Sequence, residues 1–289
     1  MSFQNTKINP KRFHPSQIKF YLFLLPLAVV MSIPVLFVLL SAFKPMEELF
    51  KFPPTIFPRN WTLENFAKMF DTMSSSSVPA SRYIFNTLLI TVLTMVLCVF
   101  FSVFAGYVLS KSKLRIKSVL NEVNTLAMMF VPVAVSIPRY IIIVRLGLYD
   151  SFFANILPIV AVPVGLFLLK QFIDQIPDAL IEAARIDGAS ELRIVWKIIF
   201  PLLKPPIATV ALLSFQSAWG NVEASNLFID DETLKSFAYF MTTFQSSNMG
   251  IAGTGISAAS ALIMFVPNLI IFIVLQSKVM DTMSTSGIK

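Results

Sequence analysis

Six apolar stretches recur along this chain of 289 residues, and each is close to the length that a helix needs to cross a lipid bilayer. A spanning helix takes about 20 apolar residues and must satisfy its own backbone hydrogen bonds, so helices are the only plausible form of these stretches. The composition agrees, because 56% of the residues are hydrophobic and only 13% are charged. The sequence therefore predicts an all-α polytopic membrane protein with six transmembrane helices, near 20–43, 84–109, 119–143, 151–172, 206–228 and 256–277.

This pattern predicts one transmembrane domain over residues 20–277, with tails at 1–19 and 278–289 and no soluble domain. The first apolar stretch is longer than the core of a signal peptide, which has about 7–15 apolar residues, so we expect it to remain as the first span. The fifth stretch gives the weakest signal, because Asn221 and Glu223 interrupt it.

Lys and Arg indicate the orientation of the chain. They are concentrated in both tails, between the second and third spans, and in the 173–204 loop between the fourth and fifth spans. Basic residues in short loops favour the cytoplasmic side, so we expect both termini and the 173–204 loop to be cytoplasmic. The net charge of +7 then reflects contact with anionic lipid and requires no nucleic acid.

The 173–204 loop contains a predicted helix–turn–helix. Pro177 and Asp178 are residues that favour a helix start, and Gly188 stands where a helix end needs positive φ. Ser190 is placed to cap a second helix that begins at Glu191. A polar hairpin in so apolar a chain indicates a partner in the aqueous phase. An ordinary amphipathic loop is the alternative.

A longer motif in the same loop resembles the inner-membrane permeases of binding-protein-dependent ABC importers. Glu182-Ala183-Ala184, Gly188, Ile198 and Pro201 match the spacing E-A-A-x(3)-G-x(9)-I-x-L-P, with Phe200 in place of the usual Leu. In that family this loop is the coupling helix, which docks in a cleft of the ATPase subunit. The resemblance implies that the ATPase-docking residues are Glu182, Ala183, Ala184, Asp187, Gly188, Ile198 and Pro201.

Other segments resemble the carbohydrate-uptake branch of these permeases, and the subunit similar to the second membrane component of the maltose transporter. These segments are SAFKP, PPTIFP and WTLENF, together with Arg82–Thr87 and Leu146–Ser151. The chain departs from that branch at 219–223, where Trp-Gly-Asn-Val-Glu replaces the usual Trp-Asn-Glu-Phe. The resemblance implies import of a sugar or oligosaccharide. A permease of the same fold for another solute, such as glycerol phosphate, is the nearest alternative.

Polar residues in or near the spans are candidates for the translocation path. Ionisable groups at membrane depth are costly, so a functional role is the first hypothesis for them, and sugars can be bound by amides and aromatic rings. Hydrogen bonding between helices, or a place in the headgroup layer, is the alternative for each one. The candidates are Asn86, Ser136, Arg139, Gln216, Trp219, Asn221, Glu223 and Asn268.

The sequence carries no catalytic constellation. The segment 250–257 approaches a phosphate-binding loop, but Ile256 stands where Lys is essential. His14 and Cys98 are the only histidine and cysteine, which excludes a His/Cys metal cluster. A membrane-embedded transferase, the rival from another class, would need acidic metal-binding clusters that the sequence lacks. We therefore expect no enzyme activity and no cofactor on this chain.

The resemblance implies the partners of the chain. They are a homologous second permease, two ATPase subunits that carry ATP and Mg, an extracellular solute-binding protein, the sugar substrate and membrane lipid. The expected location is the inner or plasma membrane of a bacterial cell.

Overall fold

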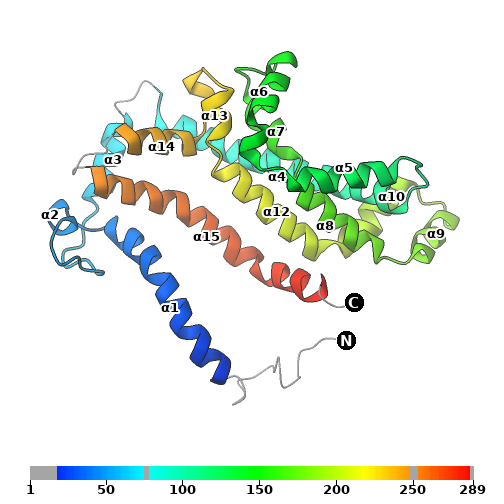
Figure 1. Ribbon diagram of the computed structural model, residues 1–289, viewed down its shortest axis with the longest axis horizontal. Helices are drawn as coiled ribbons and strands as arrows, with labels where there is room; N and C mark the ends of the chain where they lie inside the picture. The colour runs from blue at the N-terminus through cyan, green and yellow to red at the C-terminus, as the bar shows by residue number, and fades with distance from the viewer. Residues whose placement is uncertain (1–17, 75–77, 248–252, 287–289) are drawn as a thin grey trace. The chain divides into compact units, whose positions relative to one another are not determined.

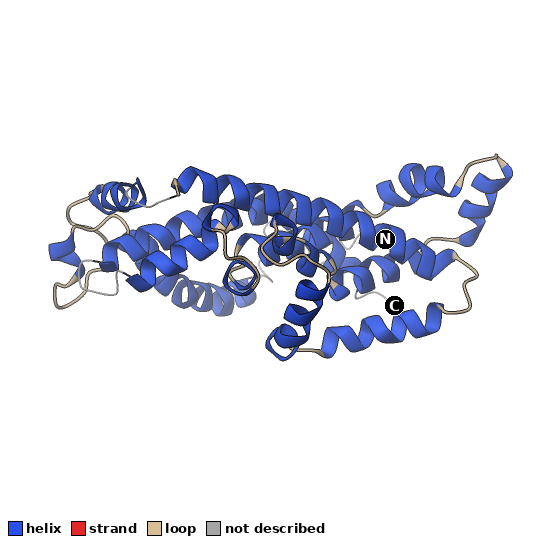
Figure 2. Ribbon diagram, turned by 90° about the horizontal axis from the view of Figure 1, so that it is seen from above, coloured by secondary structure: helices blue, strands red, loops and turns tan. Residues whose placement is uncertain are grey.

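The computed structural model describes residues 18–74, 78–247 and 253–286. Every regular element in these ranges is a helix, as Figure 2 shows, which confirms the predicted all-α class. The chain divides into two compact units, one of residues 1–72 with 247–263 and the other of residues 73–246 with 264–289.

Three helices are long and apolar enough to cross a membrane by themselves. They are α1 (Ile18–Ser41), α4 (Ala80–Lys111) and residues Gly253–Met280 of α15 (Gly253–Ser286). These helices correspond to the first, second and sixth predicted spans. Prolines do not end them, because α1 continues through Pro26 and Pro34 and α15 continues through Pro267.

The third predicted span, 119–143, is not one helix. It consists of α5 (Lys117–Met129), the 3-10 turn η2 (Pro132–Val135) and α6 (Ser136–Arg145), and the chain bends by 113° between α5 and the rest. Phe130 and Val131 are extended, with ψ of 132° and 134°. Proline disfavours helical backbone in the preceding residue, and Pro132 thus explains the break after α5.

The fourth and fifth predicted spans are also interrupted. The fourth contains η3 (Phe152–Asn155), α7 (Leu157–Val160) and α8 (Pro163–Asp174), with a bend of 44° before Pro163. The fifth begins in α12 (Lys204–Trp219), stops at Gly220 and resumes in α13 (Glu223–Leu227). A larger bend of 86° separates α12 from the residues before it.

Short elements complete the chain. Between the fourth and fifth predicted spans lie α9 (Asp178–Ile186), α10 (Glu191–Ile194), the π-helical turn η4 (Val195–Ile199) and α11 (Phe200–Leu202). After α13 come η5 (Glu232–Leu234) and α14 (Phe237–Ser247). In the first unit, α2 (Met46–Leu49) and α3 (Glu64–Ser74) follow α1.

The core of the second unit lies between α4, α8 and α12. Figure 1 shows α8 and α12 lying along α4, and these two helices make the most extensive contacts with it. Gly106 of α4 and Gly165 of α8 allow this close packing, since a Cβ on them would meet Ile173 at 3.2 Å and Val210 at 3.0 Å. A shared cluster of buried side chains follows, and it includes Cys98, Val103, Tyr107, Leu169, Ile173 and Val210.

Candidate functional site

The hairpin of α9 and α10, residues 178–194, folds as the sequence predicts. Pro177 precedes the first residue of α9, and Gly188 has a φ of +76°. The backbone N–H of Ala189 donates to the carbonyl of Ala184 at 2.9 Å, which closes the end of α9. The hydroxyl of Ser190 accepts from the backbone N–H of Arg193 and caps α10. The predictions for Pro177, Gly188, Ser190 and the start of α10 are therefore confirmed.

One face of the 178–194 hairpin is anchored in the core. Ile181 and Ile194 are buried in the same cluster as Tyr107 and Ile173, and Ala184 packs partly against it. Anchoring by these apolar side chains fixes which face of α9 is left open. Figure 1 shows α9 at one end of the unit, away from α6 and α13.

The opposite face of α9 is exposed. Glu182, Ala183 and Asp187 lie on it, next to the exposed Gly188. Ile186 is 85% exposed and joins this surface, four residues after Glu182 and so one helical turn away from it. The sequence reasoning missed Ile186. The sequence pattern could have indicated it, because Ile186 is an isoleucine one turn after Glu182, whereas Ile181 and Ala184 lie on the buried face.

Ile198 and Pro201 lie outside this exposed surface of α9. Ile198 belongs to the π-helical turn η4 and packs partly against the core. Pro201 is exposed in α11. Their place in ATPase docking stays a prediction.

A polar network ties the hairpin to the last turns of α4. The hydroxyl of Tyr107 donates to Glu191 at 2.5 Å, and the guanidinium of Arg185 donates to the same carboxylate at 2.8 Å. The ammonium of Lys111 donates to Asp178 at 2.7 Å and to the carbonyl of Ile176 at 2.6 Å. This hydrogen bond and the charge of Lys111 lower the pKa of the Asp178 carboxyl below its ordinary value.

At a different place in the unit, an ion pair joins α6 to α13. The guanidinium of Arg139 donates to Glu223 at 2.9 Å, with 24% and 34% of the two side chains exposed. Asn221 lies beside this pair, and its side-chain oxygen accepts from the backbone N–H of Ala224 at 3.0 Å. Ser136 stands one turn before Arg139 on α6, and its hydroxyl donates to the carbonyl of Val133 at 2.8 Å.

Trp219 and Asn268 meet at a single carbonyl. The indole N–H of Trp219 donates to the carbonyl of Met264 at 3.0 Å, and the side-chain amide of Asn268 donates to the same oxygen at 3.2 Å. Trp219 is buried and stacks on Phe215, with ring centroids 5.8 Å apart. Gln216 is exposed on the same helix, α12. The Trp219 N–H is thus used within the protein.

Asn86 holds a loop in place. Its buried side-chain amide donates to the carbonyls of Thr233 at 2.8 Å and Lys235 at 3.0 Å. The neighbouring Thr87 hydroxyl accepts from the backbone N–H of Phe237 at 2.7 Å. Both donor hydrogens of Asn86 are therefore used by the segment 231–237. This agrees with the alternative left open in the sequence analysis, that Asn86 makes hydrogen bonds within the protein.

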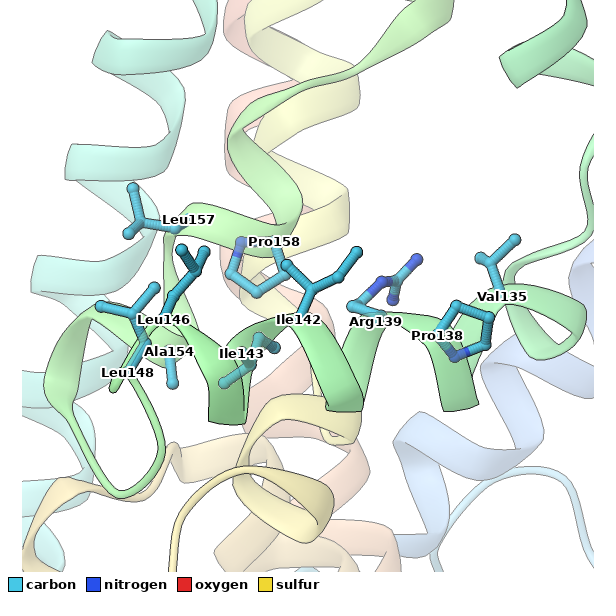
Figure 3. Close-up of a pocket in the computed structure, with 10 residues that line it drawn as sticks. All are labelled: Val135, Pro138, Arg139, Ile142, Ile143, Leu146, Leu148, Ala154, Leu157 and Pro158. Carbon is cyan, nitrogen blue, oxygen red and sulfur yellow. The ribbon is translucent and has the colours of Figure 1, made fainter.

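A cavity of about 360 Å³ opens beside Arg139. Figure 3 shows Pro138, Arg139 and Ile142 along α6, with Leu157 and Pro158 of α7 across from Ile142. Its remaining walls are apolar, so Arg139 is the one charged group among its lining residues. Within the described ranges, no three His, Cys, Asp or Glu side chains lie close enough to hold a metal ion.

Membrane-length helices and a capped polar hairpin with one exposed face define a polytopic membrane protein. Comparison with known proteins gives the family. The chain belongs to the family of inner membrane components of binding-protein-dependent transport systems, which it matches over residues 18–277. The resemblance found in the sequence is confirmed by this match.

Individual relatives are similar over most of their length. The inner membrane ABC transporter permease protein YcjP of Escherichia coli K12 is 27% identical over 276 residues, which cover 95% of this chain and 97% of YcjP. The melibiose/raffinose/stachyose import permease protein MelC of Bacillus subtilis is 28% identical, with coverage of 81% of this chain and 83% of MelC.

A solved structure has the same fold. A chain in the crystal structure of a bacterial ABC transporter involved in alginate import superimposes with a TM-score of 0.77. The match covers 93% of this chain and 99% of that chain, at 21% sequence identity. At this identity the likeness concerns the fold.

Proposed function

We propose that this chain is the transmembrane permease subunit of an ABC importer for a sugar or oligosaccharide. The 178–194 hairpin carries the proposal, because it is anchored on one face by Ile181 and Ile194 and open on the other at Glu182 and Ile186. Such a face suits insertion into a partner subunit. The family match and the saccharides named for MelC support the same function.

The proposed topology has six spans. α1, α4 and α15 cross the membrane singly, and three bent helix pairs can each form one further crossing. The transmembrane domain extends over 20–277, and the tails 1–19 and 278–289 lie in the cytoplasm with the hairpin. The concentration of Lys and Arg in these segments supports this orientation.

The proposed assembly contains a second, homologous permease, two ATPase subunits and an extracellular solute-binding protein. ATP and Mg belong to the ATPase subunits, and this chain contributes half of the translocation path. Closure of the ATPases on ATP displaces the hairpin and changes which side of the path is open. ATP can shift this equilibrium only if the docking contacts differ between the two states.

The saccharides named for MelC favour a sugar over glycerol phosphate as the substrate. The amide of Asn221 and the exposed Gln216 offer hydrogen bonds of the kind that sugar hydroxyls accept and donate. The nonsaccharide alternative therefore has less support.

Copurification and uptake test this function. The tagged chain is expected to bring down a second permease and an ATPase, and the reconstituted complex with its binding protein is expected to import labelled saccharides in an ATP-dependent manner. Labelled glycerol phosphate is the comparison solute. Uptake by the isolated chain, or ATP-driven uptake of glycerol phosphate and of no saccharide in the panel, would overturn the proposal.

A further inference from the structure

Helix α4 is the longest uninterrupted element of the second unit. Its 32 residues, Ala80–Lys111, rise by about 48 Å at 1.5 Å per residue, which exceeds the about 40–45 Å of a bilayer with its headgroups. The two ends of α4 therefore reach the two aqueous boundaries. Both ends make polar contacts that side-chain packing alone does not require.

The inner end of α4 holds the hairpin at two points. Tyr107, only 6% exposed, donates to Glu191 at the first residue of α10, and Lys111 donates to Asp178 at the first residue of α9. The carboxylate of Glu191 also accepts a hydrogen bond from the guanidinium of Arg185, in the last turn of α9. One carboxylate thus joins α4, α9 and α10.

The outer end of α4 holds the segment 231–237. Asn86 donates to the carbonyls of Thr233 and Lys235, and Thr87 accepts from Phe237. Tyr83 donates to Glu232 at 3.1 Å, one turn before Thr87. Arg82 donates to the Thr233 carbonyl as well, at 3.2 Å, so five polar contacts from one stretch of α4 fix the position of this segment.

The covalent routes out of the hairpin are less direct. Toward the C-terminus, the chain passes through the π-helical turn Val195–Ile199 and a bend of 86° before α12 begins. Toward the N-terminus, α8 ends at Asp174, and Pro177 separates it from α9. Both routes contain a break, whereas α4 contains none.

We infer that Tyr107 and Glu191 are positioning residues that pass a displacement of the hairpin to α4, which carries it to the segment 231–237 on the other side of the membrane. The inference rests on the proposed function, because the hairpin is displaced only if ATPase subunits dock on it. Tyr107 is buried and Glu191 is at the surface, so their hydrogen bond is one of the points where the hairpin is held to the core.

The test follows both ends of α4 in the whole purified complex. The inner end is measured as stimulation of ATP hydrolysis by loaded binding protein. The outer end is measured as the reaction of Thr233→Cys with a membrane-impermeant maleimide, with and without ATP and vanadate. Thr233 is exposed and the native Cys98 is fully buried, so the introduced thiol reports without background from Cys98.

The variants are Tyr107→Phe, Glu191→Gln and the pair together, with Ser112→Ala as the control. Ser112→Ala removes a hydroxyl that donates to the carbonyl of Val108 and accepts from the backbone N–H of Leu114 at the same end of α4, and neither partner belongs to the hairpin. We expect Tyr107→Phe to lower the stimulation about fivefold and to remove most of the nucleotide-dependent change in labelling, because a hydrogen bond to a carboxylate is lost. Ser112→Ala is expected to behave as the wild type.

The double variant tests whether the two residues act as one link. Its loss is expected to equal that of Glu191→Gln alone, because Tyr107 acts only through Glu191, whereas Glu191 also pairs with Arg185. Losses that add, or full nucleotide-dependent labelling in Tyr107→Phe, would overturn the inference. Tyr107→Phe keeps an aromatic ring in the core, so we expect the complex to assemble normally. If less ATPase copurifies with Tyr107→Phe, the labelling and stimulation of Glu191→Gln are used to test the inference instead. A wild-type complex with neither stimulation nor a labelling change would instead refute the proposed function.

Discussion

The guanidinium of Arg139 and the carboxylate of Glu223 lie 2.9 Å apart, although 84 positions of sequence separate them. Arg139 stands on α6, which follows the sharp break after α5, and Glu223 opens α13 after the stop at Gly220. The pair therefore connects two of the places where predicted spans are interrupted. A neutralised pair is also the form in which charges are least costly near the membrane.

Removal of one partner of this pair is expected to cost little stability. For Glu223→Gln we expect a loss of about 0.2–1 kcal/mol, since both side chains are partly exposed. Thermal unfolding of the detergent-solubilised complex measures it. The exchange of both charges, Arg139→Glu with Glu223→Arg, is expected to recover part of the loss. Glu64→Gln, which breaks the exposed Lys68–Glu64 pair, is the control for an exposed pair, and a loss well above about 1 kcal/mol in Glu223→Gln would contradict the prediction.

Gly188 is expected to tolerate substitution according to backbone conformation and not according to size. No atom lies within 4 Å of the position that a Cβ would occupy, but the φ of +76° strains residues other than Gly. Asn adopts positive φ more readily than Ala or Val. ATPase stimulation should therefore decrease least in Gly188→Asn, more in Gly188→Ala and most in Gly188→Val, while the amount of inserted protein is unchanged. Full coupling in Gly188→Val would refute this account.

Glu182 is expected to act through its charge. A carboxylate on the open face of α9 can pair with a basic residue of the ATPase, and such pairs couple by about 1.5 kcal/mol or more when partly desolvated. Glu182→Lys should impair stimulation more than Glu182→Gln, because repulsion is added to the lost pair. A reversed charge on the ATPase should restore part of the activity. If Glu182→Lys couples as well as the parent, the residue is only solvated.

Ile186 is expected to supply apolar contact to the same docking surface. Ile186→Ser removes an exposed side chain, so the isolated chain should retain its thermal stability, but less ATPase should copurify with it. Leu180→Ser is the matched control, because Leu180 is an exposed apolar residue on the same helix, at 43%. An equal loss of ATPase in both variants would show that general hydrophobicity, and not the position of Ile186, determines docking.

Glu48 is expected to make the loop between α2 and α3 sensitive to acid. Burial raises the pKa of this carboxyl. Hydrogen bonds from the backbone N–H groups of Arg59 and Asn60 and from the Thr55 hydroxyl, together with the charge of Lys44, lower the pKa by more than burial raises it. The net pKa is therefore below the ordinary 4.5. A lowered folded pKa means that the stabilisation is fully present above about pH 4.5 and is lost as the pH falls through the folded value.

Hydrogen exchange of the Arg59 and Asn60 amides measures this effect. Protection, corrected for the intrinsic rate, should be constant from neutral pH to about pH 5 and should decrease below it. Glu48→Gln should show weaker protection and no such decrease. A decrease of equal size in Glu48→Gln would assign the acid sensitivity to another group.

The sequence predicts the hairpin residue by residue because each of its signals is local. Pro177, Gly188 and Ser190 act on backbone groups within four positions of themselves, so neighbours in the sequence suffice. The third span shows the limit of hydropathy. The apolar length of 119–143 predicts a membrane crossing, but length alone does not show whether the helix is straight or bent. Here the chain bends by 113° at Pro132.

The partners of the polar candidates could not be predicted in this way. Asn86 bonds to carbonyls 147 and 149 positions further on, and Arg139 finds Glu223 only after two breaks in the helices have been placed. One sequence shows that such groups are costly in a membrane, and thus that they have partners. It does not show whether the partner is the protein itself or a transported solute.

The unbroken course of α4 has a consequence for leakage. A rigid rod that pivots at a point within the bilayer moves its two tips in opposite directions. An inner tip bound to the hairpin and an outer tip bound to the segment 231–237 cannot then swing outward together. The rigidity of α4 would thus prevent the path from being open to both sides of the membrane at once. A hinge introduced into α4, for example by a Pro near Cys98, would let both sides open together, and the resulting leak would discharge an ion gradient.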